Sequence, residues 1–160
     1  MNLAREKVVV FATLGATTTV LYFGTLHVRL FPARVLAATA VDTAIPFVPL
    51  FVVPYLSFFL LALLPLWLIS DRRELRAAAF GYGLIVAISS LVFLFWPTAI
   101  PYSDVHRLTR GVVAVDLDGN AFPSLHASLG IYCALWAWRK LQTPAARCSL
   151  LVWTSLVVVS

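Results

Sequence analysis

The sequence predicts an all-α fold, a polytopic transmembrane helical bundle with four complete spans and a partial fifth. Hydrophobic residues make up 61% of the 160 residues and charged residues only 12%, whereas ordinary soluble domains carry about 25% charged residues. The apolar stretches are long, and a bilayer core of about 30 Å requires about 20 helical residues. These features predict an integral membrane protein with one domain, residues 1–160, whose loops are too short to hold a second.

Four apolar stretches of near-spanning length follow one another, with polar segments between them. They run from Val8 to Val28, from Phe51 to Ser70, from Ala77 to Trp96 and from Ser124 to Trp138. The second stretch contains Pro54 and Pro65. We expect these prolines to kink the helix rather than break it, because neighbouring helices can satisfy the freed carbonyl groups.

The last apolar segment, from Ser149 to Ser160, is too short to cross a bilayer. It gives only about 18 Å of helix, against a hydrocarbon thickness of about 30 Å. Its last carbonyl groups would be unpaired in lipid, which costs several kcal/mol for each group. We therefore expect the domain to be incomplete at its C-terminus.

The positive charges predict an orientation in which the N-terminus is cytoplasmic. The side richer in Lys and Arg faces the cytoplasm, and this side carries Arg5, Lys7, Arg72, Arg73, Arg76, Arg139, Lys140 and Arg147. The other side carries Arg29, Arg34, Arg107 and Arg110. The loop from Pro97 to Pro123 then faces outside, and we expect the cytoplasmic membrane of a bacterium. The net charge of +5 follows from this bias and from contact with anionic lipid headgroups, so no nucleic-acid partner is expected.

A cleavable signal peptide is the alternative for the N-terminal segment. Arg5 and Lys7 precede an apolar run, and Ala38–Ala40 is similar to a small-residue cleavage site. However, the run is longer than the roughly 7–15 residues of a signal core, and Arg29 and Arg34 lie between the run and that site. A retained span is therefore the better interpretation.

No metal site is expected from the cysteines. Cys133 and Cys148 lack the spacing of metal ligands. We expect both to be small buried hydrophobic residues.

The most informative motif is Asn120–Ser128, NAFPSLHAS, at the start of the fourth expected span. The Pro123-Ser124 pair predicts a helix start with Ser124 as the N-cap. The first N–H groups of the helix and the positive end of its dipole then lie beside His126. A helix start of this kind is suited to binding phosphate.

The run Phe122–His126, FPSLH, resembles the second signature of the type 2 phosphatidic acid phosphatase superfamily. It looks most like the branch of inositol phosphorylceramide synthase and its bacterial relatives, which has Pro-Ser-Leu-His where the lipid phosphatases have Pro-Ser-Gly-His. The stretches Asp42–Pro49 and Pro54–Ser57 are also similar to that branch. The resemblance covers the chain from about Asp42 to Trp138.

The resemblance implies a phosphoric ester hydrolase or phosphotransferase that works through a covalent phosphohistidine. His126 corresponds to the second histidine of the family, which gives a proton to the leaving oxygen and then takes one from the acceptor. Ser124 and the N–H groups after it would hold non-bridging phosphate oxygens. No cofactor or metal is implied. The expected substrate is a lipid-linked phosphate at the outer face, and the acceptor is water or an alcohol.

Two parts of the family pattern have no match. No histidine, aspartate or glutamate follows His126, although the third signature should bring the nucleophilic histidine and its aspartate there. The first signature, a lysine followed after six residues by Arg-Pro, has no match near Phe95–Tyr102. Arg107 and Arg110 are then candidate phosphate-binding residues, with contact to lipid phosphates as the alternative. We expect the 160-residue chain to be inactive alone.

The alternative function is a non-catalytic membrane protein, or an inactive fragment, with the same fold. A histidine at a membrane interface is often only an amphipathic anchor, and we expect this role for His27. His106 is expected to be solvated, with contact to substrate as the lesser alternative. Asp116, Asp118 and Asn120 are expected to form a solvated turn, because Asp-Gly-Asn is turn chemistry.

Overall fold

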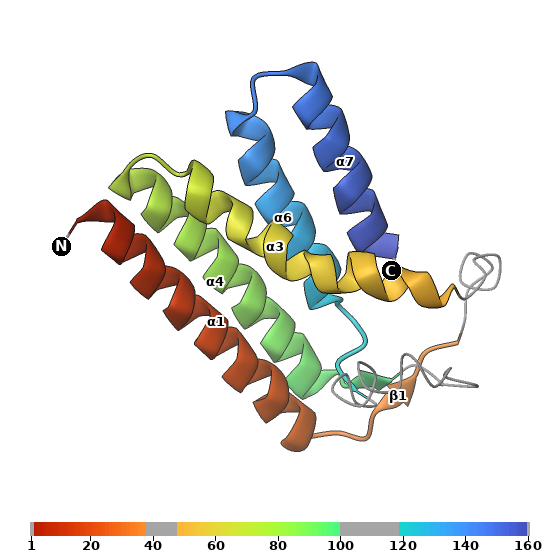
Figure 1. The fold of residues 1–160 in the computed structure, drawn as a ribbon. Coiled ribbons are helices and arrows are strands. Elements are labelled where there is room, and N and C mark those ends of the chain that lie inside the picture. The colour runs from red at the N-terminus through yellow and green to blue at the C-terminus, as the bar shows by residue number, and fades with distance from the viewer. Residues whose placement is uncertain (1, 38–47, 100–118, 160) are drawn as a thin grey trace.

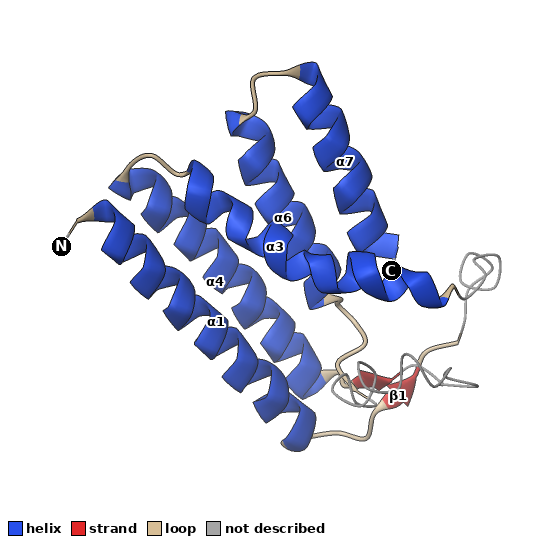
Figure 2. Ribbon diagram, in the orientation of Figure 1, coloured by secondary structure: helices blue, strands red, loops and turns tan. Residues whose placement is uncertain are grey.

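The computed structural model describes residues 2–37, 48–99 and 119–159, and these residues form an all-helical fold with five α-helices. The helices are α1 (Leu3–His27), α3 (Val52–Leu68), α4 (Arg72–Phe95), α6 (Leu125–Lys140) and α7 (Pro144–Val159). A 3-10 turn, Pro49–Phe51, leads into α3. The short strands β1 (Arg34–Val35) and β2 (Thr98–Ala99) pair in parallel. The predicted all-α class is therefore confirmed (Figure 1, Figure 2).

Three helices begin earlier than the apolar stretches predicted, because polar residues cap them. The Asn2 side chain accepts a hydrogen bond from Arg5 N at 2.9 Å, so α1 begins at Leu3 rather than Val8. Asp71 accepts from the N–H groups of Arg73 and Glu74 and starts α4 before Ala77. Thr143 Oγ1 accepts from Ala146 N at 3.3 Å, and α7 begins at Pro144 rather than Ser149. Side-chain oxygens at these positions satisfy N–H groups that a helix start leaves unpaired.

The two prolines of α3 occupy different places in the helix. Pro54 lies in the first turn, where a residue without an N–H group costs nothing. Pro65 lies inside the helix and removes one backbone hydrogen bond. The helix continues through Pro65 to Leu68, so the expectation that it is not broken is confirmed.

The core lies where α3, α4, α6 and α7 meet. α6 packs against α3, α4 and α7, while α1 lies along α4 and runs in the same direction (Figure 1). Leu61 of α3, Phe93 of α4 and Leu129 of α6 are almost fully buried in one cluster. α6 packs against α3 and α7 at Gly130, where a Cβ atom would make ordinary van der Waals contact, at 3.6–3.8 Å, with side-chain atoms of both helices.

The outer surface of the bundle is largely apolar. Trp67 is 80% exposed and Phe80 is 74% exposed, and many Leu, Val and Ile side chains are exposed in the same way. α1 and α4 are each long and apolar enough to cross a membrane, whereas α3 and α7 are shorter apolar helices. Cys133 is buried as expected, but Cys148 is exposed, because it lies on a side of α7 that no other described helix covers.

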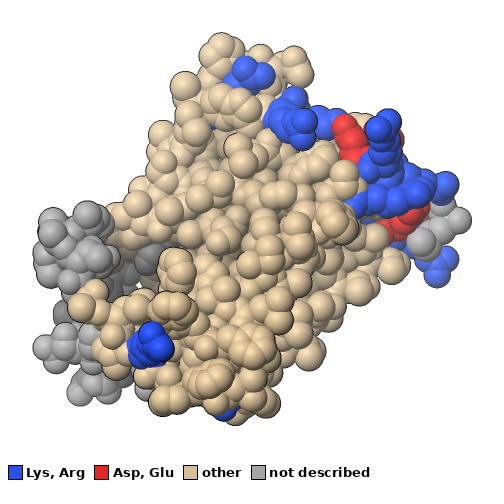
Figure 3. Space-filling view, turned by 180° about the vertical axis from the view of Figure 1, so that it is seen from behind, with Lys and Arg blue, Asp and Glu red and all other residues tan. Residues whose placement is uncertain are grey.

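Charged residues gather at one end of the bundle, which we call the charged end (Figure 3). It comprises the start of α1, the α3–α4 connection with the start of α4, and the region between α6 and α7, and it carries Arg5, Glu6, Lys7, Asp71, Arg72, Arg73, Glu74, Arg76, Arg139, Lys140 and Arg147. The paired strands and the start of α6 lie at the opposite end (Figure 1). The helices therefore connect two chemically different ends.

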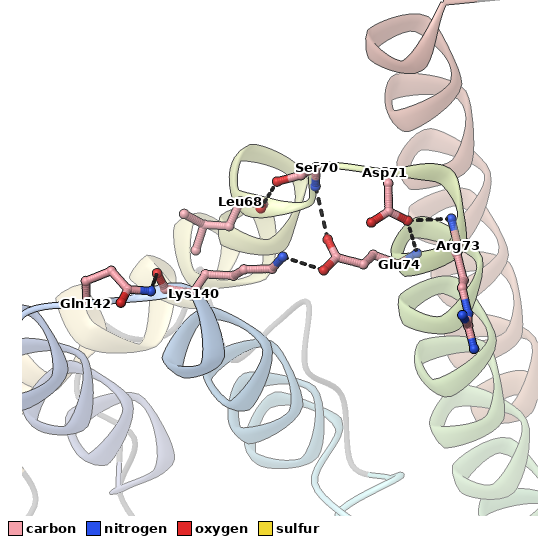
Figure 4. A network of polar contacts seen from close by, with 7 residues as sticks. All are labelled: Leu68, Ser70, Asp71, Arg73, Glu74, Lys140 and Gln142. Carbon is pink, nitrogen blue, oxygen red and sulfur yellow. Dashed lines mark hydrogen bonds and ion pairs between the residues drawn. The ribbon is translucent and has the colours of Figure 1, made fainter.

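Polar contacts hold the helices together at the charged end (Figure 4). Lys140 at the end of α6 forms an ion pair with Glu74 in the first turn of α4. Glu74 also accepts a hydrogen bond from the backbone N–H of Ser70 at 3.1 Å. The hydrogen bond from Lys140, and after it the one from Ser70, lowers the pKa of the Glu74 carboxyl. Arg72 of α4 pairs with Glu6 of α1 at 2.8 Å, so these contacts link three helices.

Candidate functional site

The start of α6 has the capped geometry that the sequence predicted. Ser124 is the N-cap, and its Oγ accepts a hydrogen bond from Ala127 N at 3.2 Å. The extended conformation of Ser124, with φ −66° and ψ 115°, is that of an N-cap residue. The prediction of Ser124 as N-cap is therefore confirmed, and His126 is the second residue of the helix.

The segment before the cap is anchored to two distant parts of the chain. Asn120 Nδ2 donates to Tyr22 O at 3.0 Å and to Thr25 Oγ1 at 3.1 Å, both on α1. Phe122 N donates to Thr98 Oγ1 at 2.8 Å, and Ala121 N donates to Thr98 O at 3.1 Å. The Phe122–Pro123 peptide bond is cis. These bonds fix the approach of the chain to α6.

The burial of Asn120 differs from the prediction made from the sequence. This residue was expected in a solvated turn, but it is only 6% exposed and adopts a positive φ of 60°. Asparagine tolerates this left-handed conformation better than most residues, and its amide can satisfy a buried carbonyl group. The partners on α1 are almost a hundred residues away in sequence, so local turn chemistry could not reveal them. Asp116 and Asp118 lie outside the described residues.

The paired strands support this end of the molecule. Arg34 N donates to Pro97 O at 2.9 Å, and Leu36 N donates to Ala99 O at 2.8 Å. The Arg34 guanidinium also lies 4.7 Å from the centre of the Trp96 ring, in a cation–π arrangement. Thr98 of β2 in turn holds Phe122, so the pairing of the strands is linked to the position of the α6 start.

The imidazole of His126 packs against aromatic rings of α3. It stacks on Tyr55 with ring centres 4.2 Å apart and an angle of 20° between the planes. The Phe58 ring lies at 4.5 Å and is tilted by 46°, and Phe59 makes a more distant edge contact at 6.4 Å. The imidazole is half-buried, and it lies against the rings of Tyr55, Phe58 and Phe59.

The sequence did not predict that the rings of Tyr55, Phe58 and Phe59 contact His126. A possible signal was the i, i+3, i+4 spacing of these aromatic residues, which places them along one side of a helix. That spacing is also the ordinary pattern of a packed helix. It therefore cannot say which residue of another helix the rings will contact.

The structure brings two of the four predicted site residues together. Ser124 and His126 lie in the first turn of α6, with Ser124 exposed and His126 half-buried. Arg107 and Arg110 lie outside the described residues, as does His106. His27 is exposed at the end of α1, and its Nδ1 lies 2.7 Å from Phe23 O. Within residues 2–37, 48–99 and 119–159, no group of three or more His, Cys, Asp or Glu side chains could hold a metal ion.

The fold and the site define an all-helical protein with two helices long and apolar enough to cross a membrane, and with a histidine in a capped helix start. No protein-family model, curated protein or solved structure matches the chain.

Proposed function

We propose that this protein is an integral membrane lipid phosphatase or phosphotransferase that acts on a lipid-linked phosphate. The observation that carries the proposal is the placement of His126 in the first turn of α6, beside the Ser124 cap. N–H groups in the first turn of a helix point outward from its end and favour an anion. A phosphate bound there would lie next to an imidazole, the side chain whose protonation changes near neutral pH.

The proposal assigns proton transfer to His126 and phosphate binding to the helix start. The imidazole would donate a proton to the departing oxygen and then accept one from water or an alcohol. The Ser124 hydroxyl oxygen accepts a hydrogen bond from Ala127 N. Its O–H group could at the same time donate a hydrogen bond to a phosphate oxygen. The phosphohistidine mechanism also needs a nucleophilic histidine, and residues 127–160 contain none.

The proposal also places α1, α3, α4 and α6 across the membrane, with α7, which has 16 described helical residues like α6, as a fifth segment. α3 has 17 residues and α6 has 16, which gives each about 25 Å of helix. A bilayer can thin locally around short helices at modest cost, and flanking Lys and Arg side chains can extend to the headgroups. The start of α6 would then face the outside of the cell, at the end opposite the charged end.

A matched pair of histidine variants tests the proposal in the protein expressed in membranes from its native gene. His126→Ala should lower the turnover of a lipid phosphate by at least about 100-fold, because general acid–base catalysis contributes that much or more. His27→Ala removes an exposed histidine at the end of α1 and should retain activity. Release of phosphate from dioleoyl phosphatidic acid is the measurement. Undiminished release by His126→Ala at equal expression would contradict the role given to His126.

A second candidate function is a non-catalytic membrane protein, and one observation favours it. The His126 ring lies within 4.5 Å of two aromatic rings of α3, which is also how a residue packs at a helix–helix contact. In this case the unsubstituted protein would release no phosphate from phosphatidic acid or other lipid phosphates. The same assay therefore separates the two candidates.

A further inference from the structure

The charged end carries more cations than its acidic residues can neutralise. It holds eight Lys and Arg residues but only three acidic residues, Glu6, Asp71 and Glu74. Each acidic group is already engaged. Glu6 pairs with Arg72, Glu74 pairs with Lys140, and the Asp71 carboxylate caps α4 by accepting two backbone N–H bonds.

Six cations at this end have no acidic partner among the described residues. They are Arg5, Lys7, Arg73, Arg76, Arg139 and Arg147, which we call the cationic surface. All but the half-buried Lys7 and Arg147 are exposed. In the described residues no acidic side chain lies elsewhere, so the excess of positive charge at this end is not offset within this part of the chain.

The two ion pairs bring these cations onto one side of the molecule. The pair of Glu6 with Arg72 holds the start of α1 against the start of α4, and the pair of Glu74 with Lys140 holds the end of α6 against α4. Arg5 and Lys7 lie on either side of Glu6 in the α1 sequence. Arg73 and Arg76 lie at the start of α4, which also carries Arg72 and Glu74 of the two ion pairs. The blue side chains at the upper right of Figure 3 show this accumulation.

Aromatic and apolar side chains border the cationic surface. The Arg139 guanidinium lies 5.6 Å from the centre of the Trp136 ring, and that of Arg147 lies 5.3 Å from the Trp138 ring. Trp67, at the end of α3, is 80% exposed. Tryptophan beside Arg or Lys is typical of the level at which a protein meets lipid headgroups. A guanidinium stacked on a ring keeps its N–H donors at its edge, where they can meet phosphate oxygens.

We propose that the cationic surface binds anionic phospholipids of the leaflet at this end, with their phosphates on the Lys and Arg side chains and their acyl chains on the apolar flanks of the bundle. The apolar border favours lipid over a water-soluble polyanion, because nucleic acid would leave the exposed Trp67 and its apolar neighbours uncovered. This interaction lies at the opposite end from His126 and does not depend on catalysis. The partner class is the singly charged phosphodiester lipid, for which phosphatidylglycerol is the probe.

Spin-labelled lipids test this proposal with the full chain in phosphatidylcholine bilayers. The measured quantity is the association constant of spin-labelled phosphatidylglycerol relative to spin-labelled phosphatidylcholine. The unsubstituted protein should prefer phosphatidylglycerol, and the preference should weaken as salt is added. The double variant Arg73→Gln/Arg76→Gln should lower the relative constant toward one, by up to about 25-fold, since each of the two removed cations contributes about fivefold near an anionic surface.

The matched control removes the same charge at the other end of the bundle. Arg29→Gln/Arg34→Gln should leave the spectrum-derived relative constant within about twofold of the unsubstituted protein, because lipids at the charged end still meet all six residues of the cationic surface. A relative constant near one for the unsubstituted protein would overturn the proposal. An equal decrease in both double variants would also overturn it, because the preference would then follow net charge alone. Capture of a duplex oligonucleotide with no preference among lipids would assign the surface to nucleic acid instead.

Discussion

Asn120 is the residue that most directly ties the start of α6 to the rest of the fold. Replacing Asn120 with alanine removes its two hydrogen bonds to α1. It also places alanine, which has a Cβ atom but no polar side chain, in the left-handed conformation with a φ of 60°. We expect Asn120→Ala to lower the free energy of unfolding by about 1–3 kcal/mol. Denaturant unfolding of the protein in micelles measures this change.

Glycine at the same position separates the two causes. Asn120→Gly loses the same hydrogen bonds but accepts the positive φ without strain, so it should be less destabilised than Asn120→Ala. An alanine variant as stable as the unsubstituted protein would show that the contacts of Asn120 with α1 do not stabilise the fold.

Residue-level features were predictable where their cause is local. Ser124 follows a proline and precedes a helical stretch, and N-cap chemistry involves only the next three residues, so its role could be deduced. The stacking of Tyr55 on His126 could not, because it joins residues of two helices. The burial of Asn120 was missed for the same reason.

At the scale of the elements, the contact between α4 and α6 depends on Gly81. A Cβ atom at this position would clash with the Tyr132 hydroxyl and would lie 2.8 Å from the ring carbon that carries it. Tyr132 cannot move freely, because its hydroxyl donates to Ala78 O at 2.9 Å. We therefore expect Gly81→Ala to destabilise the protein by about 1–3 kcal/mol, the usual cost of overpacking.

Gly83 provides the matched control within the same helix. A Cβ atom at Gly83 would meet no heavy atom of the described residues within 4 Å. Gly83→Ala should therefore be neutral, or stabilising by up to about 1 kcal/mol from helix propensity. Thermal unfolding of the two variants side by side measures the difference, and equal melting temperatures would rule out a steric role for Gly81.

The apolar stretches predicted that the helices exist, but they did not predict their starts. α4 begins five residues before the stretch that began at Ala77, and its first turn contains Glu74 and two arginines. A hydropathy profile identifies only the apolar part of a helix, whereas an N-cap such as Asp71 lets the helix begin earlier, in polar sequence. The close approach at Gly81 was equally hidden, because an isolated glycine in an apolar helix does not identify its neighbour.

At the scale of the whole molecule, the two ends of the bundle differ in their content of Lys and Arg. The sequence placed eight of the twelve Lys and Arg residues on one side, and the structure gathers these eight at the charged end. Charge segregation was predictable because it needs only the order of helices and loops. Which helices contact one another was not, since α6 lies between α3, α4 and α7 for reasons of packing that span the chain.

This polarity predicts how the protein is inserted in a membrane. A cysteine at the charged end should face the cytoplasm, and one before α6 should face the outside, because the richer positive side stays inside. Gln142, between α6 and α7, and Phe122, 60% exposed before α6, are suitable positions. In a Cys148→Ser background, where the remaining Cys133 is buried, a membrane-impermeant maleimide should label Phe122→Cys in intact cells. It should label Gln142→Cys at least tenfold more after the membrane is opened. The reverse pattern would place His126 on the cytoplasmic side, and labelling of both in intact cells would contradict a membrane between the two ends.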